Sequence, residues 1–125
     1  MIAQLFGAIF GMLAVIFGAF GAHALKKRFT EDQQKSFETG VKYQMYHAIV
    51  LLIIGEIFKA PTTVYNSIVV LFVLGTVLFS FSIYGLCLSA ASGKKMKFLG
   101  PVTPLGGLLL TIGWALLIFH FVAIL

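Results

Sequence analysis

Residues Phe17–Lys27 read FGAFGAHALKK, and in this stretch a long apolar segment meets its first charges. Small residues remove side-chain bulk from the end of the segment, at the point where His23 enters it. Lys26 and Lys27 then follow. An apolar segment of about 20 residues that ends in a basic cluster is typical of a transmembrane helix whose end faces the cytoplasm. The stretch therefore predicts a first membrane helix and its direction.

The composition predicts an integral membrane protein. Hydrophobic residues make up 60 % of the 125 residues and charged residues 10 %, and few water-soluble domains could cover such a chain with polar surface. The net charge is +5, but the basic residues lie at segment ends, where topology signals and lipid headgroup contacts are expected. We therefore expect membrane lipids and no nucleic acid as partners. Cys87 is the only cysteine, so no intrachain disulfide can form.

Four apolar segments predict four membrane-spanning helices, at residues 2–25, 41–58, 64–91 and 102–125. Only helices satisfy their own backbone hydrogen bonds over such lengths in lipid. The predicted fold class is therefore all-α: an integral membrane, antiparallel four-helix bundle that forms a single transmembrane domain over residues 1–125.

The segment between the first two apolar stretches predicts further helix. Thr30 and Gln33 have the spacing of a capping box, and Glu31 and Asp32 favour a helix N-terminus. This pattern indicates a short interfacial helix on the cytoplasmic surface. It is either hinged at Gly40 or continuous with the second membrane helix as its N-terminal extension.

Lysine and arginine are distributed unevenly among the three connections. The first connection region carries five of them, the second carries Lys59 alone, and the third carries three. Because positive charge accumulates on the cytoplasmic side, the first and third connections are predicted inside and both termini outside.

Small residues predict close helix packing, because they let membrane helices approach one another. The set on the first helix is Gly7, Gly11, Ala14, Gly18 and Gly21, and the set on the fourth is Gly106 and Gly107. We expect these surfaces to contact other helices of the same chain; a seam between two copies is the alternative.

Six polar residues are predicted to lie in the cytoplasmic half of the four helices, given a rise of about 1.5 Å per residue. Polar side chains are costly against lipid and should turn inward and pair. Pairs four residues apart share one helix face. The predicted ligand-binding cluster is His23, Tyr43, His47, Ser80, Tyr84 and Thr103. The alternative interpretation is that these side chains only hydrogen-bond to hold the helices in register.

A basic rim is predicted around this cluster, suited to anionic lipid; the alternative is that its charges serve topology alone. The rim is Lys26, Lys27, Arg28, Lys94, Lys95 and Lys97. No metal or cofactor is expected, because His120 belongs at the opposite surface and Cys87 has no partner thiol. No acid is predicted near the middle of the membrane, which argues against a proton-coupled exporter.

Four motifs resemble a known family: GAFGAHALK at residues 18–26, TGVKYQMYHA at 39–48, FSFSIY at 79–84, and TPLGG at 103–107 followed by Trp114. In this order they resemble the YwdK/YgdD family, small bacterial inner-membrane proteins of unknown function with a similar mitochondrial-type relative in animals. The resemblance implies four transmembrane helices in a bacterial plasma membrane, and no established activity, substrate or cofactor. The motif of the family falls on Gly18, Gly21, His23, Tyr43, His47, Ser80, Tyr84, Thr103, Pro104, Gly107 and Trp114.

The sequence therefore predicts a small integral membrane protein, not an enzyme, that binds a lipid headgroup, small ligand or membrane partner in a polar pocket of the inner leaflet. Whether a second copy or another membrane protein is a partner stays open. One alternative is a subunit of a small oligomeric transporter or channel. The other is a membrane enzyme acting on lipid or quinone, with His23 or His47 as base.

Overall fold

The computed structural model describes residues 1–125, which form four long helices and no strands. The helices and their bounds are α1 (Ile2–Ala22), α2 (Glu31–Ile57), α3 (Thr63–Thr76) with its continuation α4 (Ser82–Ala91), and α5 (Val102–Ala123). A π-helical segment, Val77–Phe81, joins α3 to α4 without a break, and a short 3-10 helix, Lys97–Leu99, precedes α5. The all-helical prediction is confirmed.

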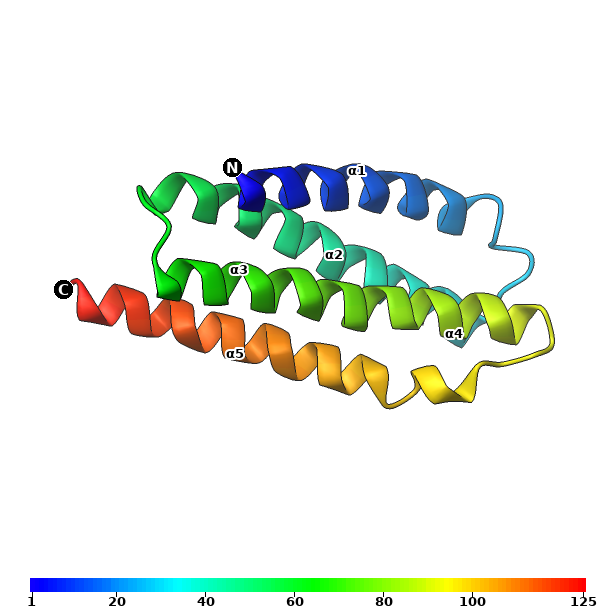
Figure 1. The fold of residues 1–125 in the computed structure, drawn as a ribbon. Helices are drawn as coiled ribbons and strands as arrows, with labels where there is room; N and C mark the ends of the chain where they lie inside the picture. The colour runs from blue at the N-terminus through cyan, green and yellow to red at the C-terminus, as the bar shows by residue number, and fades with distance from the viewer.

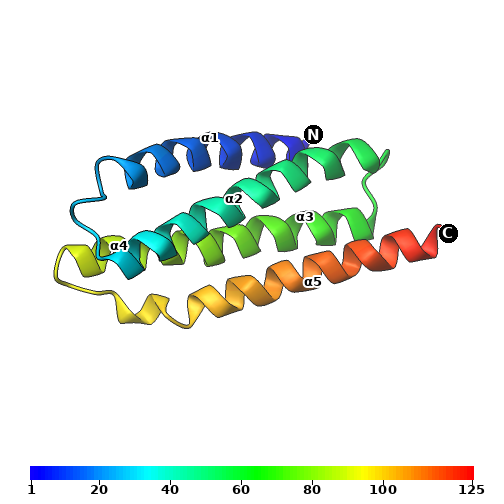
Figure 2. The same cartoon turned by 180° about the vertical axis from the view of Figure 1, so that it is seen from behind.

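The helices lie side by side and the chain turns back at each connection (Figures 1 and 2). Both termini and the α2–α3 connection lie at one end, and the α1–α2 and α4–α5 connections lie at the other. The closest packing joins α1 to α2 and α3 to α5. The molecule is thus built from two helical hairpins, with α2 of the first hairpin packed against α4 of the second.

Three helical segments are long and apolar enough to cross a membrane: Ile2–Ala22, Thr63–Ala91 and Lys97–Ala123. The predicted second span, residues 41–58, lies in α2 and is not among them. The polar and charged residues of this helix explain the difference, because Gln44 and His47 interrupt its apolar run. Both side chains are buried inside the protein, with exposed fractions of 0 % and 4 %.

The start of α2 decides between the two interpretations of the segment before it. The capping box is present: the Gln33 amide donates to Thr30 Oγ1 at 3.1 Å, and the Thr30 amide donates to Gln33 Oε1 at 3.0 Å. A separate interfacial helix hinged at Gly40 is wrong, because α2 runs without interruption from Glu31. Gly40 instead accommodates Tyr84, whose ring would lie 2.8 Å from a Cβ at this position.

The small residues of α1 lie against α2. A Cβ on Gly7 would lie 2.7 Å from the Ala48 carbonyl oxygen, and a Cβ on Gly21 would lie 2.8 Å from the Phe37 ring. These are closer approaches than real side chains make. Ordinary packing within the first hairpin therefore accounts for the stripe, in the way that small residues usually serve membrane helices.

On α5, Gly106 contacts the backbone of the π-helical segment, and a Cβ there would clash with Leu78 and Phe79. Its neighbour Gly107 has only ordinary contact with the Phe79 ring, at 3.6 Å. The two predicted packing glycines of α5 therefore differ: one permits a backbone approach and the other does not.

Aromatic side chains fill the space between the two hairpins. The ring of Phe17 on α1 lies 5.1 Å from that of Tyr84 on α4, nearly edge-on, and Phe10 lies 6.5 Å from Phe81 in the same manner. Such arrangements are favourable for aromatic pairs. The hairpins are consequently joined by ring contacts and by a few hydrogen bonds from α2.

Candidate functional site

A buried hydrogen-bond network links α2 to α1 and α4. Gln44 is fully buried on α2; its Nε2 donates to the Phe10 carbonyl oxygen at 2.8 Å, and its Oε1 accepts from the Tyr84 hydroxyl at 2.7 Å. One turn earlier on α2, the Gly40 carbonyl oxygen accepts from Ser80 Oγ at 2.7 Å. These groups satisfy one another, so Tyr84 and Ser80 act as ties between the hairpins.

His47 lies further along α2 and uses both ring nitrogens within the protein. Its Nδ1 is 2.7 Å from the Tyr43 carbonyl oxygen, and its Nε2 is 3.1 Å from Trp114 Nε1 on α5. A carbonyl oxygen only accepts and an indole N–H only donates, so Nδ1 carries the proton and Nε2 accepts. The imidazole is neutral in this arrangement, and its lone pair is already engaged.

The structure does not bring the six predicted residues into one pocket. His23 is exposed at the end of α1, whereas Ala48, next to His47, faces Gly11. Gly11 precedes His23 by twelve residues, which is about 18 Å along the helix axis. The expectation that the two imidazoles share one depth is therefore wrong.

The remaining residues of the predicted cluster also lie in different surroundings. Tyr43 is 41 % exposed and packs its ring on Phe79 at 5.0 Å. Thr103 at the start of α5 lies 2.5 Å from Ser82. Because the Ser82 hydroxyl donates its one proton to the Phe79 carbonyl oxygen, Thr103 donates to Ser82. Of the six, only Thr103 lines the cleft described next.

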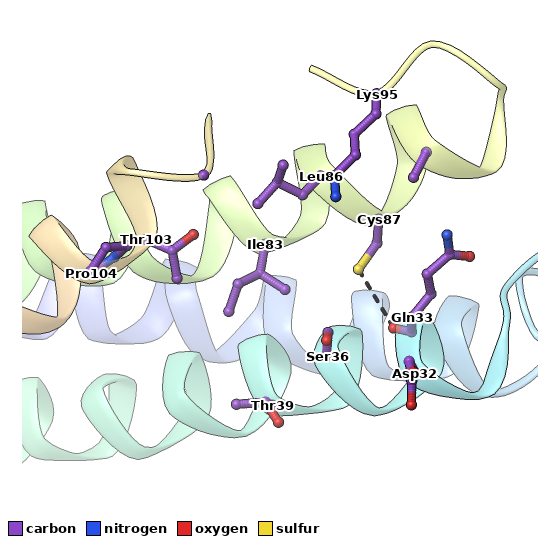
Figure 3. A pocket seen from close by; sticks show the side chains of 12 residues that line it. Asp32, Gln33, Ser36, Thr39, Ile83, Leu86, Cys87, Lys95, Thr103 and Pro104 are labelled. Carbon is purple, nitrogen blue, oxygen red and sulfur yellow. Dashed lines mark hydrogen bonds between the residues drawn. The ribbon is translucent and has the colours of Figure 1, made fainter. Parts of the chain in front are cut away.

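A cleft of about 540 Å³ opens between the first turns of α2, the length of α4 and the start of α5 (Figure 3). It lies at the end of the molecule that carries the α1–α2 and α4–α5 connections. Its floor is apolar, formed by Ile83, Leu86 and Ala90 of α4. Its other lining residues are Asp32, Gln33, Ser36, Thr39, Cys87, Lys95, Gly100, Thr103 and Pro104.

The walls of the cleft carry its polar groups. Asp32, Ser36 and Thr39 succeed one another at spacings of four and three residues, so they form one face of α2. On the opposite side, Lys95 extends from the α4–α5 connection back along α4, and Thr103 of α5 lies further along the cleft, beside Pro104 (Figure 3). The Cys87 thiol on the floor donates to the Gln33 carbonyl oxygen at 3.5 Å.

The two charges of the cleft are not paired with each other. The one ion pair within the chain joins Lys35 to Glu31, at 3.9 Å, and involves neither Asp32 nor Lys95. Of the six residues of the predicted basic rim, Lys95 alone lines the cleft. The other five lie in the two connections at the same end of the molecule.

Sequence reasoning missed residues of two kinds. Gln44 and Trp114 were not assigned to the cluster, although each supplies the partner of a predicted residue. The α2 wall of the cleft was also missed, although its residues share one polar helix face on the printed sequence. The spacing of these residues could have predicted the α2 wall from the sequence. The pairing of Trp114 with His47 could not be predicted in this way, because it depends on how the hairpins pack.

No group of three or more His, Cys, Asp or Glu residues is placed to hold a metal ion in the structure. The polar groups of the cleft are hydroxyls, an amide, one carboxylate and one ammonium. This set suits hydrogen bonding to a small polar group.

The apolar helices and the polar cleft at one end define a small helical membrane protein. Comparison with known proteins gives the family: the chain belongs to the UPF0382 membrane proteins, whose family model is described as "Protein of unknown function (DUF423)" and matches residues 17–107. The matched range contains all six residues of the predicted cluster and ends before Trp114.

Relatives of this chain occur in bacteria and in a fungus. The UPF0382 membrane protein of Staphylococcus haemolyticus is 41 % identical over 112 residues, covering 90 % of this chain and 88 % of the relative. The UPF0382 membrane protein of Schizosaccharomyces pombe is 36 % identical over 116 residues, covering 86 % of this chain and 91 % of the relative. No solved structure matches this chain.

Proposed function

We propose that this chain crosses the membrane four times as an antiparallel bundle with both termini outside, and that its cleft binds the headgroup of a membrane lipid. The location proposed is a bacterial plasma membrane, as the resemblance of the sequence motifs to the YwdK/YgdD family implies. The common end of the two basic connections supports the orientation, because six of the nine lysines and arginines lie in these connections.

The fourth crossing is α2, and its burial supports this assignment. Its polar side chains Gln44 and His47 face the protein, so they meet no lipid. Lys42 is exposed near the cytoplasmic end, where a long basic side chain reaches the headgroup region. A helix whose polar side chains face the protein and whose exposed side chains are apolar satisfies the bilayer as well as an apolar helix does.

The length of α2 indicates how deep in the membrane the cleft lies. Its 27 residues extend about 40 Å, which exceeds a hydrocarbon core of about 30 Å. The excess lies at the cytoplasmic end, because Gly21, close to the last residue of α1, packs against Phe37 and leaves the first turns of α2 beyond it. The first turns of the α2 wall, from Asp32 to Ser36, therefore lie at the level of the headgroups, and Thr39 lies deeper, beside the end of α1.

The observation that carries the proposal is this cleft, with polar walls, an apolar floor and headgroup depth. Its volume of about 540 Å³ is within the range of small-molecule sites, about 300–1,000 Å³. The headgroup would contact the hydroxyls and charges of the walls. The acyl chains would continue along the apolar surface of α4 and α5, where Leu105 and Leu108 are exposed.

The same geometry is the reason to favour binding over the enzyme alternative. A general base needs a free lone pair directed at the substrate. The Nε2 lone pair of His47 accepts from Trp114, and His23 stands alone on the surface with no side-chain hydrogen bond. Neither residue lines the cleft.

The proposal is tested by filling the cleft and measuring retained lipid. Thr103→Trp places a large ring in the cleft, and Thr111→Trp places the same ring on the exposed surface of the same helix. Both proteins are extracted in mild detergent, and bound phospholipid is counted by native mass spectrometry. We expect wild type and Thr111→Trp to retain one phospholipid and Thr103→Trp to lose it.

Ser36→Trp on the opposite wall gives a second, independent block, because the Ser36 hydroxyl has no hydrogen-bond partner to lose and its side chain is exposed. It replaces Thr103→Trp if that variant does not fold. Equal lipid retention by the folded, blocked variants and by wild type would show that the cleft binds no lipid.

A further inference from the structure

The cleft contains one acid and one base on opposite walls, and this pattern carries information about the headgroup. Asp32 belongs to α2, and Lys95 belongs to the connection that precedes α5. Neither takes part in an ion pair within the chain. The net charge of the lining is zero, although the chain as a whole carries +5. A site for a purely anionic group would be expected to gather the surrounding lysines, and this cleft includes only one of them.

A free ammonium group matches the Asp32 side. Hydroxyl oxygens of Ser36 and Thr39 lie on the same helix face as the carboxylate, and all of these oxygens accept hydrogen bonds. A primary ammonium donates three hydrogen bonds, and bonds between a charged donor and a carboxylate are the stronger kind. An anionic phosphate at this wall would instead face the charge of Asp32 with few donors to offset it.

A quaternary ammonium does not match the same wall. Such groups donate no hydrogen bonds and are recognised by aromatic side chains that surround them. No aromatic side chain lines the cleft, although the chain contains thirteen phenylalanines and four tyrosines. The walls therefore favour an ammonium group that carries protons over a choline-type group.

A phosphate matches the Lys95 side. The ammonium of Lys95 supplies positive charge and three hydrogen-bond donors. Lysine binds phosphate as a compact point charge. The two walls of the cleft therefore match opposite charges on one ligand.

We propose that the cleft selects a zwitterionic lipid headgroup with a primary ammonium and a phosphate, of the phosphoethanolamine type, bound between Asp32 and Lys95. This inference rests on the lipid-headgroup binding proposed above and adds the identity of the headgroup. The ammonium is oriented towards the α2 wall and the phosphate towards Lys95.

The test measures which lipid the protein retains from vesicles of equal parts phosphatidylethanolamine, phosphatidylglycerol and phosphatidylcholine. Wild-type protein is reconstituted, extracted and analysed by native mass spectrometry. We expect phosphatidylethanolamine to be enriched about tenfold over each of the others, since charge-assisted hydrogen bonds distinguish them. Equal retention of all three lipids, lost on blocking the cleft with Thr103→Trp, would overturn the headgroup assignment and leave lipid binding itself intact.

Neighbouring residues of the same charge provide matched controls. Asp32→Asn is expected to reduce the enrichment of phosphatidylethanolamine over phosphatidylglycerol about tenfold, whereas Glu31→Gln, outside the cleft, leaves it unchanged. Lys95→Gln is expected to reduce retention of every phospholipid about tenfold, whereas Lys94→Gln does not. Equal effects of the cleft variants and their controls would refute the assignment of the two charges.

The remaining distinction is between a lipid and its free headgroup, and alkylation of a cysteine introduced into the cleft can make it. Cys87 itself is buried, so the reporter is Pro104→Cys in a Cys87→Ser background, at an exposed residue that lines the cleft, and it can be alkylated by a small thiol reagent in delipidated protein. We expect vesicle phosphatidylethanolamine to slow this alkylation about tenfold and free phosphoethanolamine at the same concentration to have no effect. Protection by the free headgroup alone would identify a soluble ligand and overturn the lipid assignment.

Discussion

Replacing Gly106 by alanine tests the closest backbone approach between the hairpin helices α3 and α5. A Cβ at this position would lie 2.7 Å from the Leu78 carbonyl carbon and 2.8 Å from the Phe79 Cα, and closer still to the Phe79 amide nitrogen. All three atoms belong to the backbone of the π-helical segment, so no side-chain rotation relieves the contact. To restore ordinary contact distances, α5 must withdraw by about 1 Å.

The expected cost follows from two opposing terms. Overpacking of this kind costs about 1–3 kcal/mol, and an immovable backbone neighbour places it at the upper end. Alanine in place of glycine favours the helix by about 1 kcal/mol. We therefore expect Gly106→Ala to lower the free energy of unfolding by about 2 kcal/mol, which is about a 30-fold change in the unfolding equilibrium.

The adjacent glycine supplies the control. A Cβ on Gly107 would lie 3.6 Å from the Phe79 ring, an ordinary contact, so Gly107→Ala should be neutral or stabilising by up to about 1 kcal/mol. Unfolding of both variants in mixed micelles of increasing dodecyl sulfate content is followed by the fluorescence of Trp114, the only tryptophan. If the two variants unfold at the same detergent fraction, the close approach at the π-helical segment is refuted.

Two further predictions concern the core network and the orientation. Tyr84→Phe removes the donor to a buried amide oxygen and should lower the free energy of unfolding by about 1–2 kcal/mol, whereas Tyr43→Phe, at a half-exposed ring whose hydroxyl has no partner in the chain, should change it by less than about 0.5 kcal/mol. The same micelle titration measures both, and equal stabilities would contradict the structural role of the network. For the orientation, Asn66→Cys and Ser92→Cys in a Cys87→Ser background lie at opposite ends of the molecule. An impermeant maleimide added to intact cells should label the cysteine at 66 only; labelling at 92 instead would reverse the topology.

The class of the protein and its helices could be predicted from the sequence because these depend on local properties. Apolar runs of membrane length require helices wherever they lie in lipid, and the capping box at Thr30 and Gln33 is a contact within one turn. The helix ends differed by a few residues, as at Ala22, where α1 ends before the predicted residue 25.

The membership of the site could not be predicted in the same way. Depth was assigned from position in the sequence, and depth brought His23 and His47 to one level because the second helix was taken to begin at residue 41. In the structure α2 begins at Glu31 and passes beyond the end of α1, so His47 lies further than His23 from the end that carries the α1–α2 connection. The partners of the buried polar groups also depend on helix rotation, which a single sequence does not specify.

The sequence by itself determined a helical membrane protein with its basic connections at one end, since hydropathy, helix caps and charge distribution act over a few residues. Only the tertiary structure decided which polar side chains are hydrogen-bonded in the core and which have no partner within the chain. Gln44 bonds to Tyr84 and His47 bonds to Trp114, and each also bonds to the backbone, because these side chains of α2 face the other helices. Asp32 and Lys95 stay unpaired because the fold places them on opposite walls of the cleft, at the end that carries the α1–α2 and α4–α5 connections.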